Sequence, residues 1–225
     1  AEDLGVDYML AVRFTPELAA QNPEEFFTSV IMQRLHARAV MVGENFTFGH
    51  RASGNTDTLR ELGEKYGVEV DVVTLLTEDG TTISSSVIRQ LLREGDVAHA
   101  AWALGRPYRV AGEVVRGAGR GGRELGYPTA NLVLLDRTYM PADGVYTVDI
   151  EIQRKIYRGM ASVGKNVTFD GVEERFEVHI FDFSDDIYGE RVTVYWLDRI
   201  RDMVKFNSVD QLVDQLESDE KIARK

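Results

Sequence analysis

Apolar residues in the first hundred positions form short continuous runs, separated by stretches with helical spacing. The runs that we expect to be buried strands cover residues 7–14, 39–42 and 68–76. Asn22 and Pro23, followed by two acids, are typical of a helix start. The expected apolar stripe of that helix is Phe26, Phe27, Val30 and Ile31. Strands that alternate with helices predict βαβ units around a parallel sheet.

Three further helices are expected before residue 105. The first turns Leu59 and Leu62 inward. The second covers residues 84–93, is opened by serines and ends at Gly95, a residue type that commonly follows the last turn of a helix. The third covers residues 96–104.

After residues 105–107, Gly-Arg-Pro, the pattern changes to short strands separated by turns. The expected strands cover residues 108–115, 144–152, 157–163, 176–183 and 191–197. Such a succession predicts an antiparallel barrel or sandwich. Ser208 and Gln211 form a capping-box pattern for a last helix, whose expected buried face is Val209, Leu212, Val213 and Leu216. We therefore predict an α/β domain over residues 1–104 and a β domain over residues 105–225.

The amino-acid composition of the chain argues against several classes of binding partner. The 225 residues carry a formal net charge of −11, which argues against a nucleic-acid surface because phosphate backbones attract basic faces. The chain has no cysteine, which excludes disulfides and thiolate metal sites and is compatible with a reducing compartment. No apolar run approaches the length of a membrane span. We expect a cytoplasmic protein without nucleic-acid or membrane partners, and self-association is left open.

The stretch GAGRGGRELGYPTAN at residues 117–131 combines a glycine-rich, basic loop with a stiff segment. Its glycines let the backbone approach a ligand closely, and arginine charge suits phosphate. Pro128 favours an extended chain, so Thr129 and Asn131 point to the same side. A hydroxyl and an amide oxygen suit Mg²⁺ that is held together with substrate phosphates. The alternative interpretation is an ordinary glycine-rich surface turn that leads into a strand.

Three known phosphate-binding patterns do not fit this stretch. Gly117, Gly119 and Gly122 match G-x-G-x-x-G, but the dinucleotide-binding motif needs a helix that Pro128 and the β-rich sequence beyond it deny. The protein-kinase motifs H-R-D and D-F-G and the Walker sequence G-K-[ST] do not occur.

Six segments in order resemble the riboflavin kinase module of bacterial bifunctional riboflavin kinase/FMN adenylyltransferases, also called FAD synthetases. They are ALGRPYRVAGEVVRGAGRGGRELGYPTAN, PADGVYT, ASVGKNVTF, FEVHIFDF, DIYGE and KFNSVDQL, across residues 103–225. The resemblance implies an antiparallel β-barrel with a C-terminal helix. It also implies transfer of the γ-phosphate of ATP to riboflavin, with Mg²⁺, to give FMN. One departure is Asn-Val-Thr-Phe at residues 166–169, where the family usually has Asn-Pro-Thr-Phe.

The resemblance also implies roles for individual residues of the kinase module. Glu177 is the catalytic base, with His179 as the alternative, although a lone glutamate on a strand is usually only solvated. Thr129 and Asn131 bind the metal ion. The implied ATP and phosphate contacts are Gly117, Gly119, Arg120, Gly121, Gly122, Arg123, Pro128 and Thr129. The implied flavin contacts are Arg201, Met203 and Phe206, and Phe206 could equally be a contact at the entry of the last helix.

Two segments before the barrel resemble adenylyltransferase motifs of the same family, at residues 43–49 and 83–89. The residues carried over are Asn45, Phe46, Ser84, Ser85, Ser86 and Arg89. The alternative is that the serines only cap a helix. The family's His-x-Gly-His motif is absent, so we expect a partial Rossmann-like nucleotidyltransferase domain whose conversion of FMN to FAD is impaired in this chain. A flavin-binding protein without turnover is the alternative function.

Overall fold

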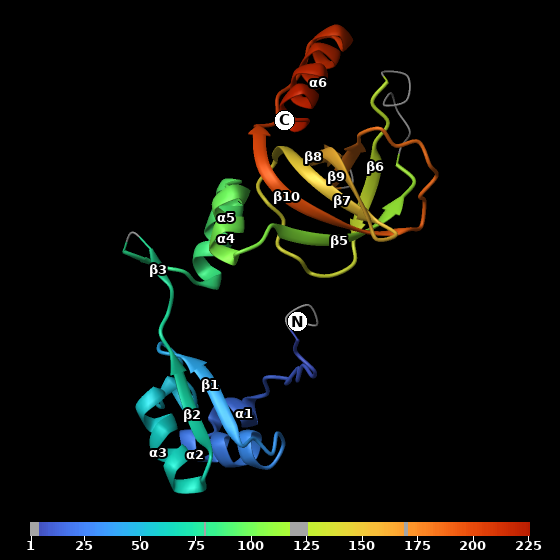
Figure 1. Ribbon diagram of the computed structural model, residues 1–225. Helices are drawn as coiled ribbons and strands as arrows, with labels where there is room; N and C mark the ends of the chain where they lie inside the picture. Colours follow the sequence, from blue (N-terminus) through green and yellow to red (C-terminus); the bar gives the residue numbers. More distant parts are fainter. Residues whose placement is uncertain (1–4, 79, 118–125, 169–170) are drawn as a thin grey trace. The chain divides into compact units, whose positions relative to one another are not determined.

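The computed structural model divides into two compact units, Ala1–Thr82 and Ile83–Lys225, and each is described by itself (Figure 1). It describes residues 5–78, 80–117, 126–168 and 171–225, and the side chains of residues 78, 81, 165–168 and 171–174 are left aside.

The smaller unit is built around two parallel strands, as the sequence pattern predicts. Strand β1 (Ala39–Gly43) pairs in parallel with β2 (Glu69–Val73), and α3 (Thr56–Tyr66) connects them. Phe27 and Leu59 are fully buried in its core. The other elements are α1 (Pro16–Ala20), α2 (Pro23–Phe26), a π-helical segment (Phe27–Met32), a 3₁₀ turn (His50–Ala52), β3 (Thr77–Glu78) and β4 (Thr81–Thr82).

The predicted helix start at Asn22 is confirmed. The Asn22 side chain accepts a hydrogen bond from the Glu25 backbone N–H, and the Glu25 carboxylate accepts one from the Asn22 N–H. These reciprocal bonds satisfy N–H groups that a helix start leaves open. Phe27, Val30 and Ile31 are buried, so the predicted apolar stripe is also confirmed.

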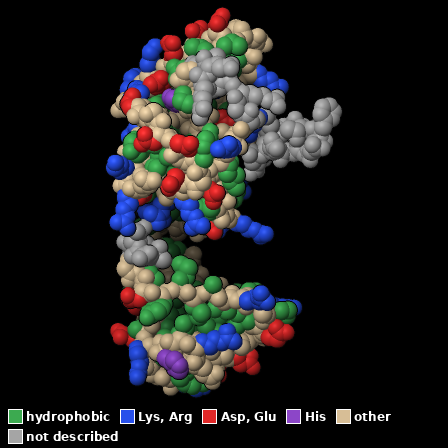
Figure 2. Space-filling view, turned by 90° about the vertical axis from the view of Figure 1, so that its right-hand side faces the viewer, with side chains coloured by type: hydrophobic (Ala, Val, Ile, Leu, Met, Phe, Trp, Pro, Cys, Tyr) green, Lys and Arg blue, Asp and Glu red, His purple; other side chains and the backbone are tan. Residues whose placement is uncertain are grey.

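The predicted buried strand at residues 7–14 is wrong. No strand is formed there, and the side chains of Tyr8, Met9 and Phe14 are 93%, 79% and 79% exposed. An apolar run becomes a strand only when another strand pairs with its backbone, and none of the described strands does so. Figure 2 shows hydrophobic side chains gathered on one face of this unit.

The larger unit contains a closed antiparallel barrel, which confirms the predicted β domain. The strand order is β10-β5-β6-β9-β8-β7 (Figure 1). The strands are β5 (Tyr108–Val115), β6 (Ala130–Leu134), β7 (Gly144–Ile152), β8 (Lys155–Thr168), β9 (Gly171–Ile180) and β10 (Arg191–Arg201). Closure removes the free edges that an open sheet would expose.

Aromatic packing fills the barrel. Tyr146 and Trp196 are fully buried and meet edge to face, with ring centroids 5.1 Å apart. Phe176 stacks on Trp196 at 5.5 Å. Because successive side chains of a strand point to opposite faces, inward Phe176 and Val178 turn Glu177 to the outside.

Helices α4 (Ser85–Glu94) and α5 (Val97–Leu104) form as expected but lie in the larger unit. Ser84 caps α4, and Gly95 adopts a left-handed conformation at its end. The two units therefore divide at Thr82, whereas we placed the domain boundary after residue 104. The domain limits 1–104 and 105–225 stay a prediction.

The terminal helix α6 (Val209–Ala223) begins where predicted, and its predicted buried face is confirmed only in part. Ser208 caps it, whereas the Gln211 side chain binds the N–H of Asn207 and not that of Ser208, so the reciprocal half of the capping box is wrong. Val209 is 58% exposed, whereas Leu212, Val213 and Leu216 are half-buried. The fully buried residues are Asp219 and Ala223. The buried face is therefore centred near the end of the helix.

Candidate functional site

Several predicted kinase residues lie on the outside of the barrel in one row, that is, in a line of residues paired directly across neighbouring strands. Strand pairing places Asn131 opposite Glu177, and Glu177 opposite Ser162. The row continues through Val145 to Arg201 at the end of β10. Directly opposed residues of neighbouring strands point to the same face of a sheet. The barrel thus brings the predicted metal, base and flavin residues to one outer face.

Thr129 and Glu177 are in direct contact, although they lie 48 residues apart in the chain. The Thr129 hydroxyl donates a hydrogen bond to Glu177 Oε2 at 3.2 Å. The other carboxylate oxygen, Oε1, lies 3.8 Å from Arg175 Nη1, and the Glu177 side chain is 28% exposed. Glu177 is therefore a half-buried carboxylate with one edge fixed by a hydroxyl and a route to solvent.

Gly117 lies against the side chain of Asn131. A Cβ atom at Gly117 would lie 2.3 Å from Asn131 Nδ2, which is closer than any real contact. A glycine at this position therefore lets the backbone lie directly against the Asn131 amide.

His179 binds the backbone of the segment that leads to Thr129. Its Nδ1 lies 2.7 Å from the carbonyl oxygen of Pro128, and a carbonyl only accepts, so Nδ1 carries the hydrogen. The imidazole is 9% exposed and lies 5.2 Å from the Tyr127 ring and 5.5 Å from the Phe181 ring. Through these contacts, His179 fixes the position of the segment before Thr129. Whether Glu177 or His179 is the base stays a prediction.

The oxygen atoms of this face fit Mg²⁺. The Thr129 hydroxyl donates its hydrogen to Glu177 and keeps lone pairs for a cation, and the Asn131 amide supplies a second hard oxygen. Among the described residues, no group of three or more His, Cys, Asp or Glu could hold a metal ion. Two neutral protein oxygens match a Mg²⁺ ion that takes its remaining ligands from water and substrate phosphates.

Most of the predicted phosphate loop lies outside the described residues, namely Gly119, Arg120, Gly121, Gly122 and Arg123. The guanidinium of Arg116, just before the loop, lies 5.4 Å from the centroid of the Tyr188 ring. Arg116, at the end of the described part of this segment, therefore lies beside an aromatic side chain.

The three predicted flavin residues follow one another at the other end of the row. The Met203 sulfur lies 3.7 Å from the Ser162 hydroxyl, and a Cβ at Gly164 would lie 3.3 Å from the Met203 methyl carbon. The Arg201 guanidinium lies 5.7 Å from the Phe206 ring. Met203 is 48% exposed. The structure thus forms a partly apolar surface here, and the flavin role of these residues stays a prediction.

The predicted adenylyltransferase residues fall in two different units. Phe46 follows β1 and stacks on Phe48 at 5.6 Å, while its neighbour Asn45 is exposed. In the larger unit, the Ser84 hydroxyl accepts from the Val87 N–H at 3.4 Å, so the alternative capping role is present. Ser85, Ser86 and Arg89 are exposed at the start of α4. Their nucleotide contacts stay predictions.

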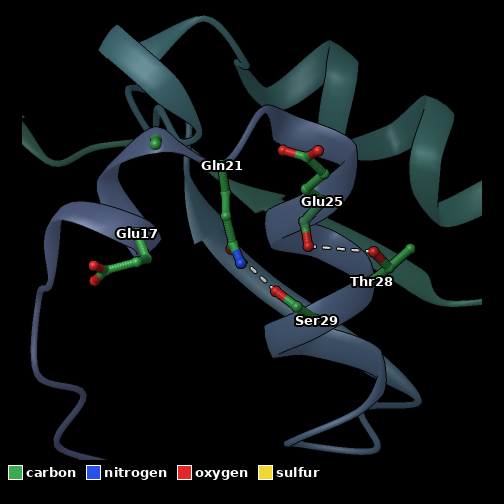
Figure 3. Close-up of a pocket in the computed structure, with 6 residues that line it drawn as sticks. Glu17, Gln21, Glu25, Thr28 and Ser29 are labelled. Atoms are coloured by element: carbon green, nitrogen blue, oxygen red, sulfur yellow. Dashed lines mark hydrogen bonds between the residues drawn. The ribbon is translucent and has the colours of Figure 1, made fainter.

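A polar cavity of about 420 Å³ in the smaller unit contains none of these residues. Its lining includes Glu17, Gln21, Glu25, Thr28 and Ser29 (Figure 3). Gln21 accepts a hydrogen bond from Ser29 at 3.0 Å, and Thr28 donates to the Glu25 carbonyl at 3.2 Å. Two pairs of lining residues therefore bind one another, and we assign the cavity no role.

Sequence reasoning missed Ser162 of the outer face and Asp219 of helix α6. Ser162 was recognisable only through the alternation of β8, in which its neighbours Ala161 and Val163 are buried. Asp219 was missed because an acid on an amphipathic helix is ordinarily exposed, and its partner Arg201 lies on a distant strand.

Comparison with known proteins matches two parts of the chain to two families. Residues 104–225 match the riboflavin kinase family, and residues 1–87 match the FAD synthetase family. Bifunctional riboflavin kinase/FMN adenylyltransferase of Haemophilus influenzae is 35% identical over 99% of this chain and 72% of its own length. The protein of that name from Listeria monocytogenes is 37% identical over 98% of this chain and 70% of its own length.

A solved structure also resembles the chain over most of its length. It is a crystal structure of a Streptococcus pneumoniae chain named macrolide-efflux protein, 53% identical, with a TM-score of 0.86. The match covers 94% of this chain and 67% of the other. In the part of this chain that the structure describes, none of the helices is long and apolar enough to span a membrane.

Proposed function

Because the chain belongs to the family of bifunctional riboflavin kinase/FMN adenylyltransferases, we propose that its barrel transfers the γ-phosphate of ATP to riboflavin on the outer face that carries Thr129, Asn131 and Glu177. The observation that carries this placement is the hydrogen bond from Thr129 to Glu177, with Asn131 paired opposite Glu177. It joins the metal and base candidates in one small area.

In the proposed reaction, Glu177 accepts the proton of the terminal ribityl hydroxyl. The hydroxyl oxygen forms a bond to the γ-phosphorus, and the bond between that phosphorus and the β–γ bridging oxygen breaks. The products are FMN and ADP, and the proton resides on the Glu177 carboxylate until solvent takes it. The Thr129 hydroxyl keeps Oε2 oriented, which fixes the carboxylate for proton transfer.

Thr129 and Asn131 would hold Mg²⁺ together with the phosphates of ATP. The ion would neutralise the charge that develops on the transferred phosphoryl group. Gly117 allows the backbone to lie against the Asn131 amide, and His179 holds the backbone just before Thr129. We place the flavin ring toward Arg201, Met203 and Phe206, and we place the protein in the cytoplasm.

The FAD synthetase match extends the proposal to the first part of the chain. Residues 1–87 belong to the part that adenylylates FMN in proteins of this name. Ser85, Ser86 and Arg89 are our candidates for nucleotide phosphate contacts at the start of α4. No observation favours the alternative of a flavin-binding protein without turnover.

The test of the kinase proposal is the conversion of riboflavin to FMN by the purified 225-residue chain. We expect FMN, resolved from riboflavin by chromatography, when both ATP and Mg²⁺ are present. Omission of either ATP or Mg²⁺ is the control. Unchanged riboflavin in the complete mixture would refute the assignment.

A further inference from the structure

We infer that Asp219 of helix α6 is a positioning residue for the kinase reaction, because it holds the guanidinium of Arg201 on the outer face of the barrel. The inference rests on the proposed function, since Arg201 matters to the reaction only if this face binds riboflavin.

The burial of Asp219 is unusual for an acid. Its side chain is fully buried, whereas the next acid of the helix, Glu220, is 25% exposed. A buried carboxylate is costly unless charged and hydrogen-bonding groups compensate it. A buried ion pair seldom adds net stability over apolar packing. Asp219 therefore does more to fix geometry than to drive folding.

The contacts of Asp219 converge on one edge of the Arg201 guanidinium. Arg201 Nε lies 3.0 and 2.9 Å from the two carboxylate oxygens, and Nη2 lies 2.8 Å from Oδ2. Gln215 donates to Oδ1 at 2.8 Å and orients the carboxylate in turn. The planar guanidinium is thereby held in one orientation.

The remaining contacts of Arg201 leave donors available to a ligand. Its Nη1 donates to the Asp202 carbonyl at 2.9 Å, and the Phe206 ring lies 5.7 Å from its central carbon. A guanidinium has five N–H donors, and these contacts with described residues use three of them. The other two can donate to acceptor atoms such as the ring carbonyl oxygens of a flavin.

The distance of Arg201 from Glu177 along the row also suits a contact with the flavin ring. It is separated from Glu177 by three strand spacings, roughly 14 Å along the barrel surface. Riboflavin carries its reacting hydroxyl at the end of a ribityl chain, remote from its ring system. A flavin with that hydroxyl at Glu177 therefore extends its ring toward Arg201.

A second anchor of α6 provides the matched control. Arg224 donates to the two carboxylate oxygens of Asp182 at 2.8 and 3.1 Å and lies over the Phe181 ring at 4.4 Å. This anchor attaches the same helix without touching Arg201. Asp182 has a positive φ of 55°, which asparagine tolerates well, so Asp182→Asn removes the charge without backbone strain.

The test measures FMN formation by the full chain, by four single variants and by one double variant, together with their melting temperatures. They are Asp219→Asn, Asp219→Glu, Asp182→Asn and Arg201→Gln, with the double variant Asp219→Asn/Arg201→Gln. We expect Asp219→Asn to raise the KM for riboflavin about tenfold, since a hydrogen bond to a charged group is worth at least that factor. kcat and the KM for ATP stay within about twofold. Asp219→Glu keeps the charge but moves it by one methylene, so it raises the same KM while retaining more stability.

Asp182→Asn leaves the riboflavin KM unchanged, and adding Asp219→Asn to Arg201→Gln causes no further rise. The inference is overturned by an equal rise of the riboflavin KM in Asp182→Asn, by additive effects in the double variant, or by an unchanged KM in both Asp219 variants. In each of these cases FMN formation by the parent still supports the proposed function. If the parent makes no FMN, the proposed function fails. Quenching of riboflavin fluorescence then decides the inference: weaker binding in both Asp219 variants supports the contact, and equal binding overturns it.

Discussion

Replacing Glu177 by glutamine tests the proposed base with little change in shape. Glutamine keeps an oxygen that can accept the Thr129 hydrogen bond, now 3.2 Å long, and replaces only the basic carboxylate. A positioned general base contributes about 10²–10⁴-fold to a rate, or roughly 3–5 kcal/mol of barrier. Phosphoryl transfer often has a loose transition state with little proton removal, which favours the lower end of that range.

We therefore expect Glu177→Gln to lower kinase kcat by about 10²-fold, with the riboflavin KM little changed. The ion contact with Arg175 spans 3.8 Å at a partly exposed site, so its loss costs about 1 kcal/mol of folding stability or less. Steady-state FMN formation measures the rate, and thermal unfolding checks the fold.

Glu151→Gln is a matched control, because Glu151 also accepts a hydroxyl hydrogen bond on a barrel strand, from Tyr195 at 2.6 Å. It lies six residues beyond Val145 on β7, roughly 20 Å along the strand, and its variant should keep the parental rate. Near-parental kcat in Glu177→Gln together with loss of activity in His179→Gln would transfer the role of base to His179. Normal turnover in both would refute any base on this strand.

Thr129→Ala and Asn131→Ala should each lower turnover and raise the Mg²⁺ concentration needed for half-maximal rate, since each removes one oxygen ligand; parental Mg²⁺ titrations would refute the metal role. Gly117→Ala should push the Asn131 amide aside, because the added Cβ would lie 2.3 Å from Nδ2. We expect a rate loss of up to about 10²-fold from such a displacement with the melting temperature nearly unchanged, and an unchanged rate would contradict the close approach. The Arg224 hydrogen bonds lower the pKa of Asp182 below its ordinary value of 3.8. The contribution of this ion pair to the attachment of α6 is fully present above that value and is lost as the pH falls through the lower, folded-state pKa. The protection of α6 amides against hydrogen exchange should therefore fall on acidification in the parent but not in Asp182→Asn. Identical pH profiles of protection in the two proteins would contradict this.

Local patterns in the sequence predicted the barrel strands well. The strands at residues 108–115 and 144–152 have the predicted limits because alternation and turn residues act within a few positions. Residues 7–14 have an equally apolar sequence but form no strand. Strand formation depends on a pairing partner, which lies elsewhere and leaves no mark on the run itself.

The candidate site was predictable only in part, because its contacts join distant positions. Motif order singled out Thr129 and Glu177, but their hydrogen bond depends on the pairing of β6 with β9. The ion pair of Arg201 with Asp219 depends on how α6 packs. Helical periodicity favoured Val209 for burial, whereas the contact with the barrel lies near the other end of the helix.

The most direct test of the kinase site follows the γ-phosphate itself. The 225-residue chain is incubated with riboflavin, Mg²⁺ and ATP labelled at the γ-phosphorus, and the flavins are then separated. We predict that label enters FMN in equal amount to the ADP formed, and that Glu177→Gln and Thr129→Ala slow this transfer. Label that appears only in inorganic phosphate, with no labelled flavin, would contradict it.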